Sequence, residues 1–194
     1  MSKSDSGASK KERNKTIRWV ITIFLTTIVV SGTISFTSDV IMANSTMLVA
    51  FIILLTIILI GILFDVVGVA VTSADEKPFH SMAARKVPGA QESIRLLRNA
   101  ERVSSICNDV VGDICGVVSG SASATIAAQV LSNFEFSWSN LVPLLMSALV
   151  AGLTVGGKAI GKTFAMGSCT VIVHSVGKIV WACSHFPQLL KKRS

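Results

Sequence analysis

The stretch "MLVAFIILLTIILIGILFDVVGVAV", residues 47–71, determines the class of this protein. It is longer than the roughly 20 apolar residues that an α-helix needs to cross a bilayer. Asp65 is the only charged residue in it. A carboxylate inside a membrane span is rare, and it usually faces the protein interior and pairs with another group. The stretch therefore predicts a membrane protein with a polar group in its core.

The composition agrees with that class and excludes two others. The chain has 194 residues, of which 51% are hydrophobic and 15% charged, whereas soluble domains carry about 25% charged residues. The net charge is +7, but the basic residues cluster between apolar runs, which is typical of topology signals and not of a nucleic-acid surface. The cysteines form no C-x-x-C pair, so we expect buried apolar side chains and no zinc or redox site.

The remaining apolar segments predict an all-α integral membrane protein. Its parts are a disordered basic tail (1–16), an extra N-terminal anchor helix (17–36), a three-helix core (spans 47–71, 105–130 and 141–160), short cytoplasmic helices (73–104), a juxtamembrane C-terminal helix (164–186) and a basic tail (187–194). The glycines and lysines of "TVGGKAIGKTFA", residues 154–165, predict a helix that is interrupted near Gly156 and Gly157.

Positive charge predicts the orientation in the bilayer. Residues 37–46 and 131–140 contain no Lys or Arg, whereas the N-terminal tail, the 72–104 segment and the C-terminal tail are basic. The positive-inside rule then places both termini in the cytoplasm. We expect the plasma membrane as the location.

A second polar stretch, "SICNDVVGDICG", residues 105–116, carries Asp109 and Asp113. Four residues apart, they would share one face of a helix. Oxygen ligands of this kind suit Mg²⁺, so these aspartates with Asp65 and Asn108 predict a cation site. The alternative interpretation is a structural salt bridge from the carboxylates to Lys158 or Lys162.

A glycine repeat follows in the same span. Gly112, Gly116 and Gly120 recur every four residues, a spacing that lets a second helix approach closely. The partner helix would belong either to this chain or to the second copy in a homodimer.

The order of these motifs resembles the transmembrane domain of the cyclin M / CorC-type magnesium transporters. The stretch "FDVVGVAVTS" (residues 64–73) is similar to the end of that family's first helix. "CNDVVGDI" (107–114) is similar to the Asn-rich part of its second helix, and "GKAIGKTFA" (157–165) to the end of its third. The resemblance covers residues 47–186. Several positions differ: the family's Ser and Glu in the first helix are Asp65 and Gly68, and in its third helix the acid before P-K-T is Lys158 and the Pro is Gly161.

The resemblance implies a transporter of divalent cations, with magnesium as the transported ion and no organic cofactor. It places the metal ligands at Asp65, Asn108, Asp109 and Asp113, with Lys158 as an internal counter-charge. The family's cytoplasmic CBS region is missing from this sequence. The alternative function is therefore a non-transporting membrane scaffold or regulator that pairs with a full-length transporter. No Ser–His–Asp or Cys–His pattern is readable, so we do not expect an enzyme.

Overall fold

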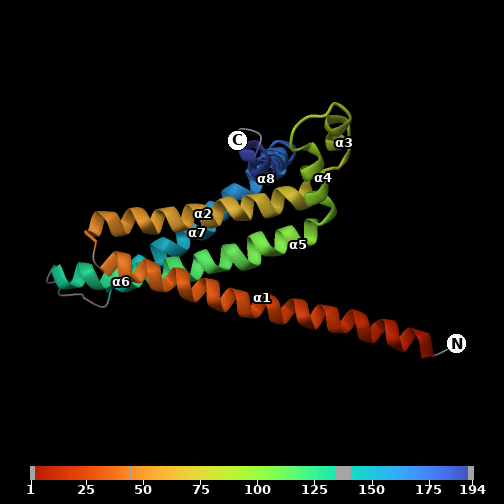
Figure 1. Cartoon of the computed structure of the whole chain (residues 1–194). Helices are drawn as coiled ribbons and strands as arrows, with labels where there is room; N and C mark the ends of the chain where they lie inside the picture. The colour runs from red at the N-terminus through yellow and green to blue at the C-terminus, as the bar shows by residue number, and fades with distance from the viewer. Residues whose placement is uncertain (1–2, 44, 134–140, 192–194) are drawn as a thin grey trace.

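The protein is all-helical in the computed structural model, which describes residues 3–43, 45–133 and 141–191 and has no strand in these ranges (Figure 1). The predicted all-α class is confirmed. The elements are α1 (Lys3–Ala43), α2 (Met47–Ser73), α3 (Lys77–Ala84), α4 (Ala90–Arg98), α5 (Ala100–Ser105), the π-helix η1 (Ile106–Gly112), α6 (Asp113–Asn133), α7 (Leu141–Gly167) and α8 (Cys169–Lys191).

Four helices in the described ranges are long and apolar enough to cross a membrane. They are residues 16–42 of α1, the whole of α2, the continuous helix α5–η1–α6 and α7. The apolar part of α8, Cys169–Ser184, is shorter. In Figure 1, α1 and α6 run in one direction and α2 and α7 in the other, so α3, α4 and α8 gather at one end of the bundle. This is the anchor helix, three-helix core and separate C-terminal helix that the sequence predicts.

The predicted boundaries are wrong at several points. Helix α1 begins at Lys3 and ends at Ala43, so the tail predicted to be disordered is helical from Lys3 and the anchor helix continues beyond residue 36. Helix α7 continues to Gly167 without the break predicted at Gly156 and Gly157, and α8 begins at Cys169 instead of 164. Glycine lowers helix stability by about 1 kcal/mol relative to alanine. In lipid, however, an interrupted helix would leave backbone groups without hydrogen bonds, so the helix persists.

Small residues let the three core helices approach closely. A Cβ on Gly61 of α2 would lie 2.9 Å from Cβ of Cys115 on α6. On α7, a Cβ on Gly161 would lie 2.7 Å from Val66 of α2, and one on Gly157 would collide with Ile62. Helix association in membranes depends on such close packing, because lipid chains are as apolar as the helix surfaces.

The core helices bury two apolar clusters with a polar layer between them. The first cluster contains Met42, Ala50, Leu54, Ile58, Ala122, Ile126 and Val150. The second contains Ala70, Val71, Phe79, Leu97, Ala165 and Val173. Asp65 lies between the two clusters along α2, and Lys158 lies between them along α7. The fold therefore places the charged residues of two spans at the same level.

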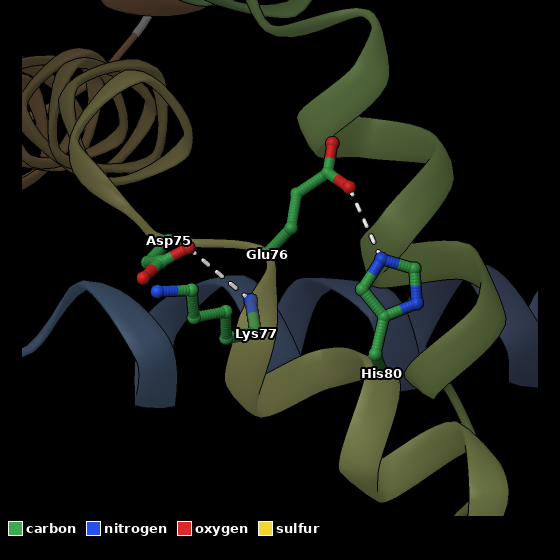
Figure 2. A network of polar contacts seen from close by, with 4 residues as sticks. All are labelled: Asp75, Glu76, Lys77 and His80. Carbon is green, nitrogen blue, oxygen red and sulfur yellow. Dashed lines mark hydrogen bonds and ion pairs between the residues drawn. The ribbon is translucent and has the colours of Figure 1, made fainter.

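The corner between α2 and α3 is closed by local polar contacts (Figure 2). The backbone N–H of Lys77 donates a hydrogen bond to Oδ1 of Asp75 at 3.2 Å, which holds the start of α3. Nε2 of His80 lies 3.2 Å from Oε2 of Glu76, one turn earlier. Both members of that pair are exposed to solvent, so it contributes little to stability.

Helix α8 is held by a backbone crossing with α4. Gly89 has a φ of 84°, and a Cβ there would lie 2.6 Å from the backbone nitrogen of Lys178. A Cβ on Gly177 would collide with Ser93, whose hydroxyl donates to the carbonyl of Gly89 at 2.9 Å. His174 lies beside this crossing, where burial and, secondarily, Lys178 lower its pKa. These contacts attach α8 to the cytoplasmic helices predicted by the sequence.

We predict the orientation of the bundle from these ends. Ser45, before α2, should lie outside the cell, and the exposed Gln91 on α4 should lie inside. In intact cells an impermeant thiol reagent should label Ser45→Cys and leave Gln91→Cys at the level of the wild-type chain. Lysed cells are the control, because both variants should then react. Labelling of Gln91→Cys in intact cells would contradict the topology.

Candidate ion-pair site between α2, α6 and α7

Asp65 and Lys158 form an ion pair inside the helical core. Nζ of Lys158 lies 3.8 Å from Oδ1 of Asp65, and their side chains are 23% and 5% exposed, respectively. The pair joins α2 to α7, which approach each other at Gly161. A charged side chain at the membrane centre costs about 2.5–3.5 kcal/mol on insertion scales. Pairing the two opposite charges reduces this penalty for both helices, and it bears out one of the salt bridges considered from the sequence.

The third helix completes the site through η1. A Cβ on Gly112 would lie 3.3 Å from Nζ of Lys158, so the absence of a side chain there makes room for the ammonium group. Four residues earlier, the side-chain amide of Asn108 packs directly on Gly68 of α2, where any Cβ would collide with it. Nδ2 of Asn108 donates to Oγ of Ser104 at 3.2 Å. Asn108 and Gly112 thus form the wall of the site that faces α2 and α7.

Three oxygen atoms in this region are buried without a hydrogen-bond partner. They are Oδ2 of Asp65, Oδ1 of Asn108 and Oγ1 of Thr154, which precedes Lys158 by one turn of α7. A buried polar atom that makes no hydrogen bond costs about 1–3 kcal/mol. The 3.8 Å separation in the ion pair is also longer than a direct hydrogen bond. The site therefore has unused capacity to accept hydrogen bonds or to bind a cation.

Asp109 and Asp113 do not converge on this site, so the prediction that three carboxylates meet is wrong. Both side chains are exposed on the outer face of the helix. Oδ2 of Asp109 accepts a hydrogen bond from Oγ of Ser105 at 2.7 Å. In the described residues no group of three or more His, Cys, Asp or Glu side chains could hold a metal ion. Asp109 follows Asn108, which faces α2, and Asp113 follows Gly112, which faces Lys158 of α7; adjacent residues on a helix point in different directions.

The π-helix coincides with the residues that form the wall. It spans Ile106–Gly112 and includes both Asn108 and Gly112. Such insertions are rare and often occur at functional sites. No pattern of residues predicts this π-helix. The inward face of this span could have been identified from the spacing of its small and polar residues, which are Asn108, Gly112, Cys115 and Ser119. Gly112 and Ser119 are buried on that face.

Lys162, the second lysine considered from the sequence as a salt-bridge partner, lies outside the site. Lys162 follows Lys158 by one helical turn, but it is exposed. Long basic side chains near the end of a span extend toward the interface.

In the glycine repeat, Gly112 has a neighbour in the chain, whereas a Cβ on Gly116 or Gly120 would have no atom within 4 Å. The predicted partner for that ridge is therefore not in contact with it in this arrangement.

No protein-family model, curated protein or solved structure matches this chain. The resemblance to the cyclin M / CorC-type transporters remains a prediction from the motifs. The function is therefore inferred from the geometry of the site.

The ion pair makes a prediction about stability. Removal of one partner from a buried pair typically costs about 3–5 kcal/mol, because the other charge is left uncompensated. Lys158→Met should therefore lower the melting temperature in detergent strongly, and Asp65→Asn/Lys158→Met should recover much of the loss. Lys162→Met is the matched control on the same helix, with an expected effect within about 0.5 kcal/mol. Equal effects of Lys158→Met and Lys162→Met would show that the ion pair contributes nothing.

Proposed function

We propose that this protein is a membrane cation carrier in which Lys158 occupies the place of the transported ion. The observation that carries the proposal is the Asp65–Lys158 pair, which lies in a polar layer between two apolar clusters. Ionisable groups inside membrane spans usually mark ion pathways when they face the bundle interior. Asp65 is almost completely buried in that interior.

The unpaired oxygens supply what a cation would need. If the ammonium group of Lys158 leaves, both carboxylate oxygens of Asp65 become available. Oδ1 of Asn108 is a further neutral oxygen from the adjacent helix, and it already lacks a hydrogen-bond donor. Mg²⁺ binds such oxygens through one or two carboxylates and usually keeps several waters. The residues present are thus compatible with a hydrated magnesium ion as cargo.

Lysine can leave the site because its side chain is long and part of it is accessible. Lys158 is 23% exposed, and Lys162 one turn later reaches the surface. A lysine side chain can extend its ammonium group toward water while its methylene groups stay in apolar surroundings. Exchange between the ammonium group and a cation would keep Asp65 neutralised in both states. Lys158 would then act as a tethered competitor of the transported ion.

Charge balance determines which ion fits best. Replacing an ammonium group by a monovalent cation leaves the site neutral, whereas Mg²⁺ beside a single buried carboxylate leaves one excess positive charge. Lys158→Glu restores the acid that the resembled family has at this position. It should therefore bind divalent ions more tightly than the wild-type chain does. Ligand binding to the folded state raises stability by mass action, so the effect is measurable as a shift in melting temperature.

A second function has its own supporting observation. Only one of the three predicted carboxylates lies in the core, and a lysine already neutralises it. A permanent ion pair of this kind would serve a non-transporting scaffold or regulator that associates with a full-length transporter. The carrier requires the pair to open, and the scaffold requires it to stay closed.

Reconstituted protein can separate the two functions. In liposomes that contain a magnesium-sensitive dye, we expect slow uptake with the wild-type chain, because one excess positive charge opposes Mg²⁺ in its site. We expect faster uptake with Lys158→Glu and none with Asp65→Asn. Lys162→Gln should behave like the wild type, because its side chain lies outside the site. Sodium and potassium dyes test the monovalent alternative in the same vesicles. No flux of any ion and no cation-dependent melting shift, for folded wild type and Lys158→Glu, would favour the scaffold.

A further inference from the structure

Helix α1 is attached to α6 through hydrogen bonds in its C-terminal part. Oγ of Ser121 on α6 donates to Oδ1 of Asp39 at 3.2 Å. Nε2 of Gln129 donates to the carbonyl of Met42 at 2.9 Å. Figure 1 shows α1 beside α6 at this end and running away from α5 and η1 toward its N-terminus. Much of the α1 span therefore stands apart from the helix that it begins to pack against.

The face of α1 that continues this contact is polar. Between Trp19 and Met42, the residues that are not fully exposed recur every three or four positions: Ile23, Thr27, Ser31, Ser35, Ser38, Asp39 and Met42. The hydroxyls of Thr33 and Thr37, on a different face, bond to backbone carbonyls of α1 itself. A line of hydroxyl groups thus extends from Asp39 along the side of α1 that leads away from its contact with α6.

The matching face of α6 and η1 is uncovered and carries the two aspartates outside the ion-pair site. Asp109 and Asp113 are exposed, as is Val117 after them. Gly116 and Gly120 lie beside this face with open space above them, which is the arrangement that lets a helix approach closely. Carboxylates that face lipid chains in a span are strongly unfavourable, so this face needs a polar partner.

We take the register of the two helices from the Asp39–Ser121 contact, the hydrogen bond that lies nearer the open part of α1. The helices run in the same direction and rise by the same 1.5 Å per residue. Starting from Asp39 beside Ser121, one turn back brings Ser35 level with Val117, and further turns bring Ser31 level with Asp113 and Thr27 level with Asp109. A four-residue step exceeds a full turn in an α-helix but falls short of one in the wider π-helix. Asp113 lies two such steps before Ser121 and is turned by about 80° from it, as Ser31 is from Asp39 on α1, so the two faces stay together when the helices cross at an angle. The π-helix η1, which ends before Asp113, turns Asp109 part of the way back.

We propose that α1 is a strap that closes along α6, pivoting at the Asp39–Ser121 contact. In the closed position the hydroxyls of Thr27 and Ser31 donate hydrogen bonds to Asp109 and Asp113. Closure removes both carboxylates from lipid and fills the space beside the glycine ridge. The occupant is this chain's own helix because the new contact is continuous with an existing interface. The strap does not depend on the proposed transport, since it uses a different face of the helix from Gly112.

Cross-linking in liposomes tests the closed position. Ile23 and Ser105 are level in the register and lie four turns from the pivot, so Ile23→Cys/Ser105→Cys should be linked within one chain by a bifunctional thiol reagent. Leu25→Cys/Ser105→Cys is the matched control, because Leu25 is at nearly the same level on the opposite side of α1. The single variant Ser105→Cys controls for the native cysteines. Equal yields for the two pairs, or a link between two copies, would overturn the proposal.

A second measurement needs no cysteine variant. Dicyclohexylcarbodiimide is apolar and modifies carboxyl groups that are accessible from lipid, and mass spectrometry locates the product. Asp109 and Asp113 of the wild-type chain should react slowly, and Ser31→Leu should raise their reaction several-fold. Thr33→Leu, on the other face of α1, should leave it unchanged. Rapid modification in the wild type that Ser31→Leu does not alter would show that α1 stays open, which would overturn the proposal.

Discussion

A carboxylate that is withdrawn from water inside a bilayer has to be neutralised, and the pair between Asp65 and Lys158 meets this requirement. The pair demands that α7 lie close to α2, which Gly157 and Gly161 permit. It also demands space for an ammonium group on the third helix, which Gly112 provides. The buried charges thus explain why glycines recur where the three helices meet, although the pair itself need not stabilise the fold more than apolar packing would.

Much of this arrangement could be predicted from the sequence. The apolar spans and the absence of Lys and Arg from alternate loops predict the number of core helices and the ends that lie together. The lone acid of residues 47–71 and the lysine of the last span predict a salt bridge as one of two alternatives. In each case the signal is a strong local contrast between charge and an apolar background, which does not depend on how the helices are rotated.

Rotation of the helices is what the sequence could not supply. Asn108 and Asp109 are neighbours, and only one of them can face α2. Asn108 does so because it lies in the π-helix and its side chain packs against Gly68, which has no side chain of its own. The break predicted at Gly156 and Gly157 fails for a related reason, because helix propensity is weaker than the need to satisfy backbone groups in lipid. Tertiary packing and the solvent decide both points, and neither appears in a pattern of residue types.

The polar groups of the long third span therefore divide between two faces. Asn108 and Gly112 belong to the core with the ion pair, whereas Asp109 and Asp113 are exposed on the outer face of the helix. This division gives one buried carboxylate to the candidate cation site instead of three. The two proposed functions therefore differ in one feature: in the carrier the ammonium group of Lys158 leaves Asp65, and in the scaffold it stays there.

The most direct test of the ion pair is the chemical reactivity of Lys158 itself. Full-length protein in liposomes is treated with a membrane-permeant amine-acetylating reagent, and the modification of Lys158 and Lys162 is compared by mass spectrometry. We predict that Lys158 reacts much more slowly than Lys162, because its ammonium group is held against Asp65 in the helical core whereas Lys162 is exposed, and that Asp65→Asn removes most of the difference. Similar rates for both lysines in the wild-type chain, or no effect of Asp65→Asn, would contradict a neutralising pair in the membrane core.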